Sequence, residues 1–232
     1  MSILLLRLSG PMQSWGLQSR FTERDTGLEP SKSGVVGLLC AAMGRKRHEP
    51  VNDLAALRMD ARVDCGGSMM YDFQTAQGVR VANAKTSRTK SSLTNSISRR
   101  YYLADARFLV GLEGDDHDLL RHLYNALRAP HWPLYLGRKA FVPGEPVWLE
   151  DGLKRGIGLE SALKTYPWLG NDRRRWERLE RVRVVREDPD GSEVRPDQPI
   201  SFAERRFAPR RVRTGFIDRP PFKEESPCTS PA

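Results

Sequence analysis

Cysteine and long apolar runs are scarce in this 232-residue chain, and each shortage removes a class of structure. Its three cysteines, Cys40, Cys65 and Cys228, show no CxxC spacing. An odd number without such a pair predicts neither a disulfide framework nor a zinc site, and it favours a reducing, cytoplasmic environment. The apolar run from Ile3 to Leu6 ends at Arg7, too short for a secretion signal or for the roughly 18 residues of a membrane helix. We therefore expect a protein that is neither exported nor inserted into a membrane.

Groups suited to catalysis are also few. His117 and His122 lie five positions apart on an expected helix, a spacing that does not put both on one face for a metal. No Ser–His–Asp pattern or paired carboxylates stand out. One alternative stays open, in which His131 near Tyr135 and Lys139 forms a metal-independent endoribonuclease cluster that processes repeat RNA. We expect no catalytic residue, no metal and no cofactor.

Negative charge is missing from one long segment. Residues 73–104 contain no Asp or Glu, in a chain whose net charge is +9. Excess positive charge favours a polyanionic partner, although a merely solvated basic loop is the alternative. The segment has too few large apolar residues to bury a core, so we predict a protruding β-hairpin that becomes ordered on RNA. Its candidate RNA-binding residues supply charge and a stacking ring: Arg80, Lys85, Arg88, Lys90, Arg99, Arg100 and Tyr101, with Tyr102 beside them.

Hydrophobic patterning predicts an α+β fold with a ferredoxin-like, RRM-like N-terminal domain. Ser33 is the expected N-cap of the first helix, and Gly44 is its expected end. The order β-α-β-β-α-β follows from strands at 3–8, 58–64, 104–113 and 134–142 and helices at 33–44 and 115–129.

Proline changes in frequency along the chain, since thirteen of the sixteen lie from residue 130 onward. This shift predicts an RRM-like domain over 1–144, with a thumb insert at about 76–102, and a smaller, mostly β region over 145–220. In that region we expect a helix near 159–165, a strand pair turning at 188–191 and a basic strand at 205–213. Residues 221–232 are expected to form a disordered tail.

Three short motifs could face a ligand. In residues 10–16, glycines flank Gln13 and Trp15 and would let a backbone approach closely, although a turn with a core-filling Trp is the alternative. Lys32 and Ser33 lie at a helix start that attracts phosphate, or serve only as its cap. Arg138 and Lys139 could face RNA across the sheet or form a charge pair at its edge. Two arginine clusters, 173–175 and 205–213, suit a protein partner as well as nucleic acid.

Taken together, GPMQSWG at 10–16, PSKSGVVGLL at 30–39 and YLGRK at 135–139 resemble the CasD family of type I-E CRISPR Cascade subunits. The resemblance implies an RRM-like domain with a thumb hairpin that binds the 5′ handle of the crRNA. It implies CasC backbone, CasA large-subunit and remaining Cascade subunits as partners, with target DNA reached only indirectly. It also implies that another subunit, CasE, cuts the precursor RNA, so that this chain only holds the handle. The handle-facing residues would be Gln13, Trp15, Lys32, Ser33, Arg138 and Lys139. An unrelated basic RRM-like protein, such as a ribosome-associated factor, remains the competing interpretation.

Overall fold

A computed structural model describes residues 1–17, 22–79 and 93–223 of the protein. The helices are α1 (Lys32–Met43), α2 (Asn52–Ala55), α3 (His117–Arg128), α4 (Leu159–Thr165) and α5 (Arg173–Glu177). The strands are β1 (Ser2–Ser9), β2 (Met12–Gln13), β3 (Glu23–Arg24), β4 (Arg58–Cys65), β5 (Ser68–Val79), β6 (Thr94–Ala104), β7 (Arg107–Gly114), β8 (Trp148–Arg155), β9 (Arg181–Glu187), β10 (Glu193–Ser201) and β11 (Arg206–Asp218). None of the helices in these ranges is long and apolar enough to cross a bilayer.

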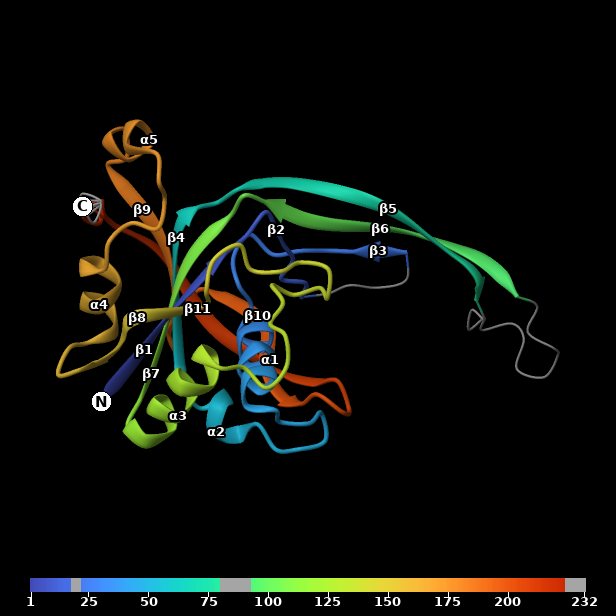
Figure 1. Cartoon of the computed structure of the whole chain (residues 1–232), viewed down its shortest axis with the longest axis horizontal. Coiled ribbons are helices and arrows are strands. Elements are labelled where there is room, and N and C mark those ends of the chain that lie inside the picture. The colour runs from blue at the N-terminus through green and yellow to red at the C-terminus, as the bar shows by residue number, and fades with distance from the viewer. Residues whose placement is uncertain (18–21, 80–92, 224–232) are drawn as a thin grey trace, which may run out of the picture.

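One seven-stranded sheet of order β10-β11-β9-β4-β7-β1-β8 forms the body, and its neighbouring strands pair antiparallel (Figure 1). The predicted α+β class is therefore confirmed. Strands from the C-terminal region join both sides of the N-terminal strands, because β8 pairs with β1 and β9 pairs with β4. Both regions of the chain thus contribute to a single sheet.

The expected fourth strand at 134–142 is wrong, and β8 takes its place beside β1. Residues 134–142 form turns instead. Pro133 and Pro143 flank the segment, and Gly137 has a φ of +95°, so a regular ladder cannot run through it. When α2 and the strands β2, β3, β5 and β6 are set aside, the order along the chain is β1-α1-β4-β7-α3-β8.

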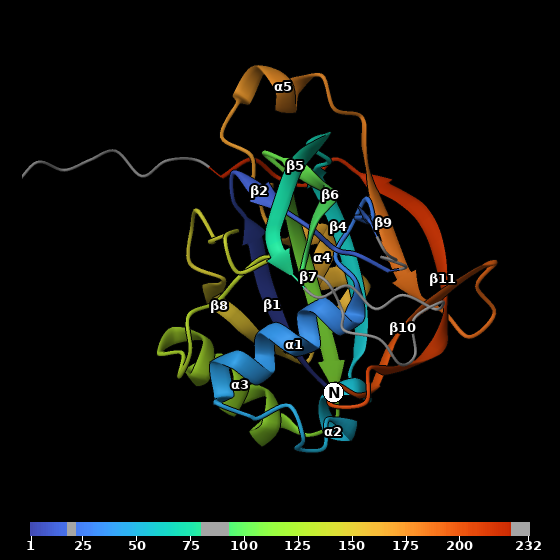
Figure 2. The same cartoon turned by 90° about the vertical axis from the view of Figure 1, so that its right-hand side faces the viewer.

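β1 is buried on both faces, which explains its uninterrupted run of Ile and Leu. Leu4, Leu6 and Leu8 face a core covered by α1, α2 and α3. Ile3 and Leu5 face a second core, which α4 covers. Figures 1 and 2 show α4 and α1 on opposite sides of the sheet.

The first helix has the predicted end but a different beginning. Ser31, rather than Ser33, is its N-cap, and the Ser31 hydroxyl accepts a hydrogen bond from the backbone N–H of Gly34 at 3.3 Å. Gly44 ends α1 in the left-handed region, with a φ of 74°, as expected of glycine.

The C-terminal elements follow the expected positions with one change in pairing. α4 and the basic strand β11 are present, and the chain turns at 188–191 between β9 and β10. These two strands are not neighbours, however, because β11 returns between them. Of the expected tail, Phe222 packs against Trp168 and Trp176, and residues 224–232 lie outside the described ranges.

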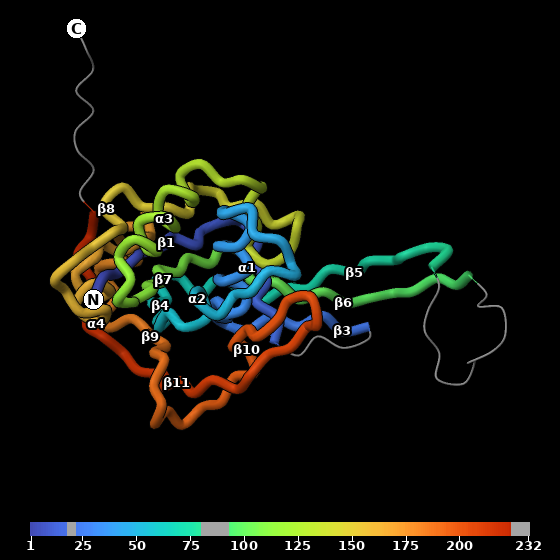
Figure 3. The backbone as a smooth tube through the Cα atoms, turned by 90° about the horizontal axis from the view of Figure 1, so that it is seen from below, coloured from blue at the N-terminus to red at the C-terminus, as the bar shows by residue number. Residues whose placement is uncertain are grey.

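A long hairpin of β5 and β6 extends away from the body, as predicted (Figures 1 and 3). It begins at Ser68, eight residues before the expected start of the thumb. β2 and β3 both pair with β6 and join the hairpin to the body.

Candidate nucleic-acid interface

The three motifs singled out in the sequence meet where the hairpin joins the body, and we call this meeting of residues 10–16, 31–34 and 135–139 the base junction. The Trp15 ring lies against Gly34 in the first turn of α1, where a Cβ would come within 2.8 Å of the ring. Gly34 therefore lets Trp15 occupy the core, with 1% of its surface exposed.

The motif at 135–139 is fixed to the motif at 10–16 by backbone contact. The N–H of Ser14 donates to the carbonyl of Leu136 at 3.0 Å. Gly137 follows with a φ of +95°, and a Cβ there would lie 1.7 Å from the Ser14 carbonyl oxygen. Only glycine fits this position, both for its backbone conformation and for its space.

Gln13 is fully buried and links the strands beneath the base junction. Its side-chain amide donates to the carbonyls of Leu8 and Ala106 at 3.1 and 2.7 Å, and its Oε1 accepts from the Trp15 indole N–H at 3.2 Å. The side chains of Gln13 and Trp15 therefore support the interface from inside rather than form its surface. The alternative interpretation of this motif, a turn whose Trp fills the core, is therefore the one that the fold shows.

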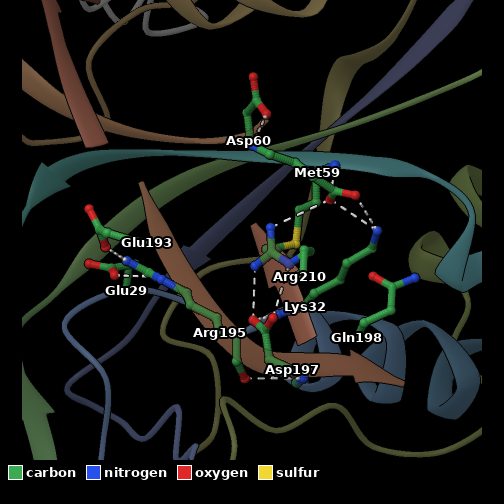
Figure 4. A network of polar contacts seen from close by, with 12 residues as sticks. Glu29, Lys32, Met59, Asp60, Glu193, Arg195, Asp197, Gln198 and Arg210 are labelled. Carbon is green, nitrogen blue, oxygen red and sulfur yellow. Dashed lines mark hydrogen bonds and ion pairs between the residues drawn. The ribbon is translucent and has the colours of Figure 1, made fainter. Parts of the chain in front are cut away.

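Lys32 is likewise buried, at the centre of an ionic cluster (Figure 4). Its Nζ donates to both carboxylate oxygens of Glu187 at 3.0 Å, and its backbone N–H donates to Asp197 at 2.8 Å. Burial lowers the pKa of Lys32 from its usual value, against the opposing effect of Glu187. The cation is thus used to join α1 to β9 and β10, whereas its neighbour Ser33 is half-buried and borders the surface.

Part of the arginine cluster at 205–213 belongs to the same ionic cluster. Arg210 donates to both oxygens of Asp197 at 3.0 and 2.8 Å, and it lies 3.4 Å from Glu187. Arg213 pairs with Asp188 on the surface at 2.5 Å. These two cations therefore stabilise the sheet and are not free for a ligand.

One face of the hairpin carries an exposed row of rings. Tyr71 and Phe73 are each 55% exposed, and their ring centroids lie 5.7 Å apart. Tyr101 stands opposite Tyr71 at 5.8 Å, and the Arg99 guanidinium lies over the Phe73 ring at 5.3 Å. Exposed rings beside a guanidinium suit the stacking of single-stranded bases. Tyr71 and Phe73 were missed in the sequence, although they alternate with polar residues where the acid-free segment begins.

The opposite face of the hairpin leads to the base junction. Tyr102 packs against Phe141 at 5.8 Å, and the Arg138 guanidinium lies over the same Phe141 ring at 5.4 Å. Arg138 also donates to the carbonyls of Tyr101 and Arg24 at 2.8 and 3.2 Å, so it holds the hairpin to the body.

The remaining predicted cations differ in their surroundings. Arg100 is half-buried and donates to the Ser98 hydroxyl at 3.1 Å, whereas Lys139 is exposed beside Arg138. Arg80, Lys85, Arg88 and Lys90 lie outside the described residues.

The alternative catalytic cluster is not assembled in the described part of the chain. No hydrogen bond or ion pair there joins His131, Tyr135 and Lys139, and the His131 ring packs against Gly44 and Trp132. The described residues also hold no group of three or more His, Cys, Asp or Glu placed to bind a metal.

Comparison with known proteins defines the class. A family model described as CRISPR-associated protein (Cas_Cas5) matches residues 3–213, so the chain belongs to this family. Its relatives include the CRISPR system Cascade subunit CasD of Escherichia coli (strain K12), 32% identical over 187 residues, which are 74% of this chain and 80% of that protein. The resemblance to CasD is thereby confirmed.

Two solved structures share the fold. One, described as "Crystal structure of Cas protein", is 44% identical with a TM-score of 0.75, over 95% of this chain and 98% of its own. Another, described as "CRISPR RNA-guided surveillance complex", is 33% identical with a TM-score of 0.73, over 93% of this chain and 90% of its own.

Proposed function

We propose that this protein is a Cascade subunit that holds the 5′ handle of the crRNA on the ring-bearing face of the hairpin, without cutting it. The family membership and the CasD relative support a place in a CRISPR ribonucleoprotein. In such a complex base pairing reads the target, so the protein must recognise the backbone and shape of its RNA. Its partners are then the crRNA, the CasC filament that it caps, the CasA large subunit and the remaining Cascade subunits in the cytoplasm.

The observation that carries this proposal is the exposed face of Tyr71, Phe73, Arg99 and Tyr101. A solvent-exposed row of rings contributes little to folding, but each ring can stack on a base that has left a helical stack. The sequence between β5 and β6 is basic and contains no acidic residue, so it supplies the charge that phosphates require. Stacking and charge together suit single-stranded RNA.

The RRM-like unit proposed for residues 1–144 consists of β1, β4, β7, α1 and α3, completed by β8 from the region that follows. Ser14 and Arg138 hold the hairpin on this unit, because both donate to the Tyr101 carbonyl, at 3.2 and 2.8 Å. Arg138 and Lys139 extend the cationic surface from the hairpin onto the body. A hairpin held at a fixed angle can wedge into a guide RNA and set where the handle ends.

The test is an RNA-binding measurement on two matched double variants of the full chain. Tyr71→Ala/Phe73→Ala removes two rings from one face, and Gln74→Ala/Ser98→Ala truncates two side chains on the other face. Since one stacked base contributes about 1–3 kcal/mol, we expect the first variant to bind a repeat-derived handle RNA at least tenfold more weakly. Thermal unfolding verifies that both variants are folded.

Equal affinities of the two variants would contradict the proposed binding face. A discrete cut in repeat RNA in the presence of chelator, abolished by His131→Ala, would instead support the endoribonuclease alternative. Copurification of the wild-type chain with ribosomal RNA rather than with CasC, CasA and one guide RNA would contradict the assembly.

A further inference from the structure

Helix α5, the turn after it and the first residue of β9 carry the densest group of unpaired cations in the described residues. Arg174, Arg175, Arg178 and Arg181 are exposed and have no carboxylate within ion-pair distance there. Most other described arginines have an acidic partner, as in the pairs of Arg7, Arg45, Arg62, Arg107, Arg195 and Arg210. A fold that pairs most of its arginines therefore leaves four of them free within eight residues.

The nearby acids do not neutralise this group. Asp172 caps the helix by accepting from the Arg175 backbone N–H at 3.1 Å, and Glu177 pairs with Arg173 at 3.3 Å. Neither Asp172 nor Glu180 has an ion pair in the described part of the chain. Four unpaired guanidiniums thus face two carboxylates without an ion-pair partner.

The platform beneath these arginines is rigidly anchored. A five-residue helix is too short to be stable alone. Here the Trp176 indole donates to the carbonyl of Pro220 at 2.9 Å, its ring packs against Phe222, and the Arg219 guanidinium lies 3.9 Å from its centre. Arg219 also donates to the carbonyls of Trp176 and Glu177 at 3.2 and 3.1 Å.

The geometry of a helix turns the free cations outward. Arg174 and Arg178 each lie two positions from Trp176, about 200° around the axis, so they point away from the anchored side. Like charges four positions apart weaken a helix, and nothing in the body requires this pair. Their arrangement is therefore suited to a ligand and not to stability.

The composition of the patch favours nucleic acid over protein. Protein interfaces need buried apolar anchors at their centre. None of the exposed large hydrophobic side chains in the described residues lies within 172–181, and Trp176 is already covered. Without a free ring or an apolar anchor, the patch offers only guanidiniums, which bind phosphates in a fork geometry, and phosphate contacts carry no sequence information.

We propose that Arg174, Arg178 and Arg181 form a second nucleic-acid site, which binds a phosphodiester backbone independently of sequence. Figures 1 and 2 show α5 beyond the end of the sheet from which the hairpin starts. A strand or duplex that passes the base of the hairpin would meet this site. It is separate from the handle-binding face, because it contains neither the hairpin nor the base junction.

The test compares Arg174→Ala/Arg178→Ala with a control that removes the same charge elsewhere. Lys46→Ala/Arg47→Ala truncates two exposed cations in the turn between α1 and α2, at the opposite end of the molecule (Figure 2). Fluorescence anisotropy of the full chain is followed against salt with a 20-base-pair duplex DNA and with a 20-nucleotide single-stranded RNA, both of arbitrary sequence.

We expect the α5 variant to bind about tenfold more weakly near 0.1 M salt, with a salt slope lower by about 1.8 on duplex DNA or about 1.4 on single-stranded RNA. A loss of affinity for duplex DNA alone or for single-stranded RNA alone identifies which nucleic acid supplies the phosphodiester backbone. An affinity and a salt slope equal to those of the control on both probes would overturn the proposal. If such a variant also no longer copurified with a protein partner, the patch would instead be a protein-binding surface. Handle binding through Tyr71 and Phe73 is measured separately and does not depend on this result.

Discussion

The hairpin and the base junction differ in how much of their side-chain chemistry the fold itself uses. At the base junction Gln13 and Trp15 are buried and their polar atoms are paired within the protein. On the hairpin Tyr71 and Phe73 are exposed and pack mainly against each other and their strand partners. The comparison teaches that the motif at residues 10–16 stabilises the fold from inside. The side chains that remain exposed for a ligand lie on the hairpin.

The largest expected difference concerns aromatic truncation. Trp15→Ala should lower the free energy of unfolding by about 3–5 kcal/mol, because it empties a buried site. Tyr71→Ala should change it by less than about 0.5 kcal/mol, since the ring is half exposed. Urea denaturation of both variants measures the contrast, and equal losses would contradict the division between support and surface.

Backbone substitution gives the next largest effect. Gly137→Ala places a methyl group on the Ser14 carbonyl at a φ of +95°, so we expect a loss of about 3 kcal/mol or more. Gly156→Ala is the matched control, since Gly156 has a φ of +70° with nothing within 4 Å of its Cβ position. The control should lose only about 1–2 kcal/mol. Similar denaturation midpoints for the two variants would show that the contact at Ser14 is unimportant.

A buried charge in the body should make stability depend on pH, in contrast to the exposed hairpin. Burial raises the pKa of Asp60 from 3.8 to about 6, although its carboxylate accepts from the Glu187 backbone N–H at 2.9 Å. Between about pH 4 and pH 6 the folded state retains a proton that the unfolded state has released, so raising the pH across this range costs stability.

Asp60→Asn keeps the site neutral and isolates this effect. From pH 4 to pH 7 the wild-type protein should lose about 2–3 kcal/mol of unfolding free energy relative to the variant, at about 1.4 kcal/mol for each unit by which the pKa is raised. Urea denaturation at several pH values measures the difference. A difference that stays constant with pH would show that Asp60 is ionised normally in the fold.

The smallest effect concerns Lys139. Its side chain is exposed, so Lys139→Ala should change the free energy of unfolding by less than about 0.5 kcal/mol. If Lys139 contacts one phosphate of a single-stranded handle RNA, the salt slope of binding should fall by about 0.7. An unchanged slope would limit the cationic surface of the body to Arg138.

Local patterns in the sequence predicted most elements correctly. The run of Ile and Leu before Arg7 indicated a buried strand, Gly44 indicated a helix end, and the acid-free segment indicated the hairpin. Each of these depends on residues close together in the chain.

Features that depend on distant partners were harder to predict. The sequence around Lys32 predicts a phosphate-binding cation, because its actual partners Glu187 and Asp197 lie 155 and 165 residues further along the chain. The sequence around Trp15 predicts a ring that faces a ligand, whereas in the fold the ring packs against Gly34, which has no side chain to block it. The separation of β9 from β10 depends on β11, which returns between them after the turn. Local spacing contains no information about such contacts.

The most direct test of the account is ultraviolet cross-linking of a handle-containing RNA to the wild-type chain, with the linked peptides identified by mass spectrometry. Cross-links at residues 68–104 and 135–139 are the result that the account predicts. Handle cross-links confined to α3, α4 or β8, with none on the hairpin, would contradict it.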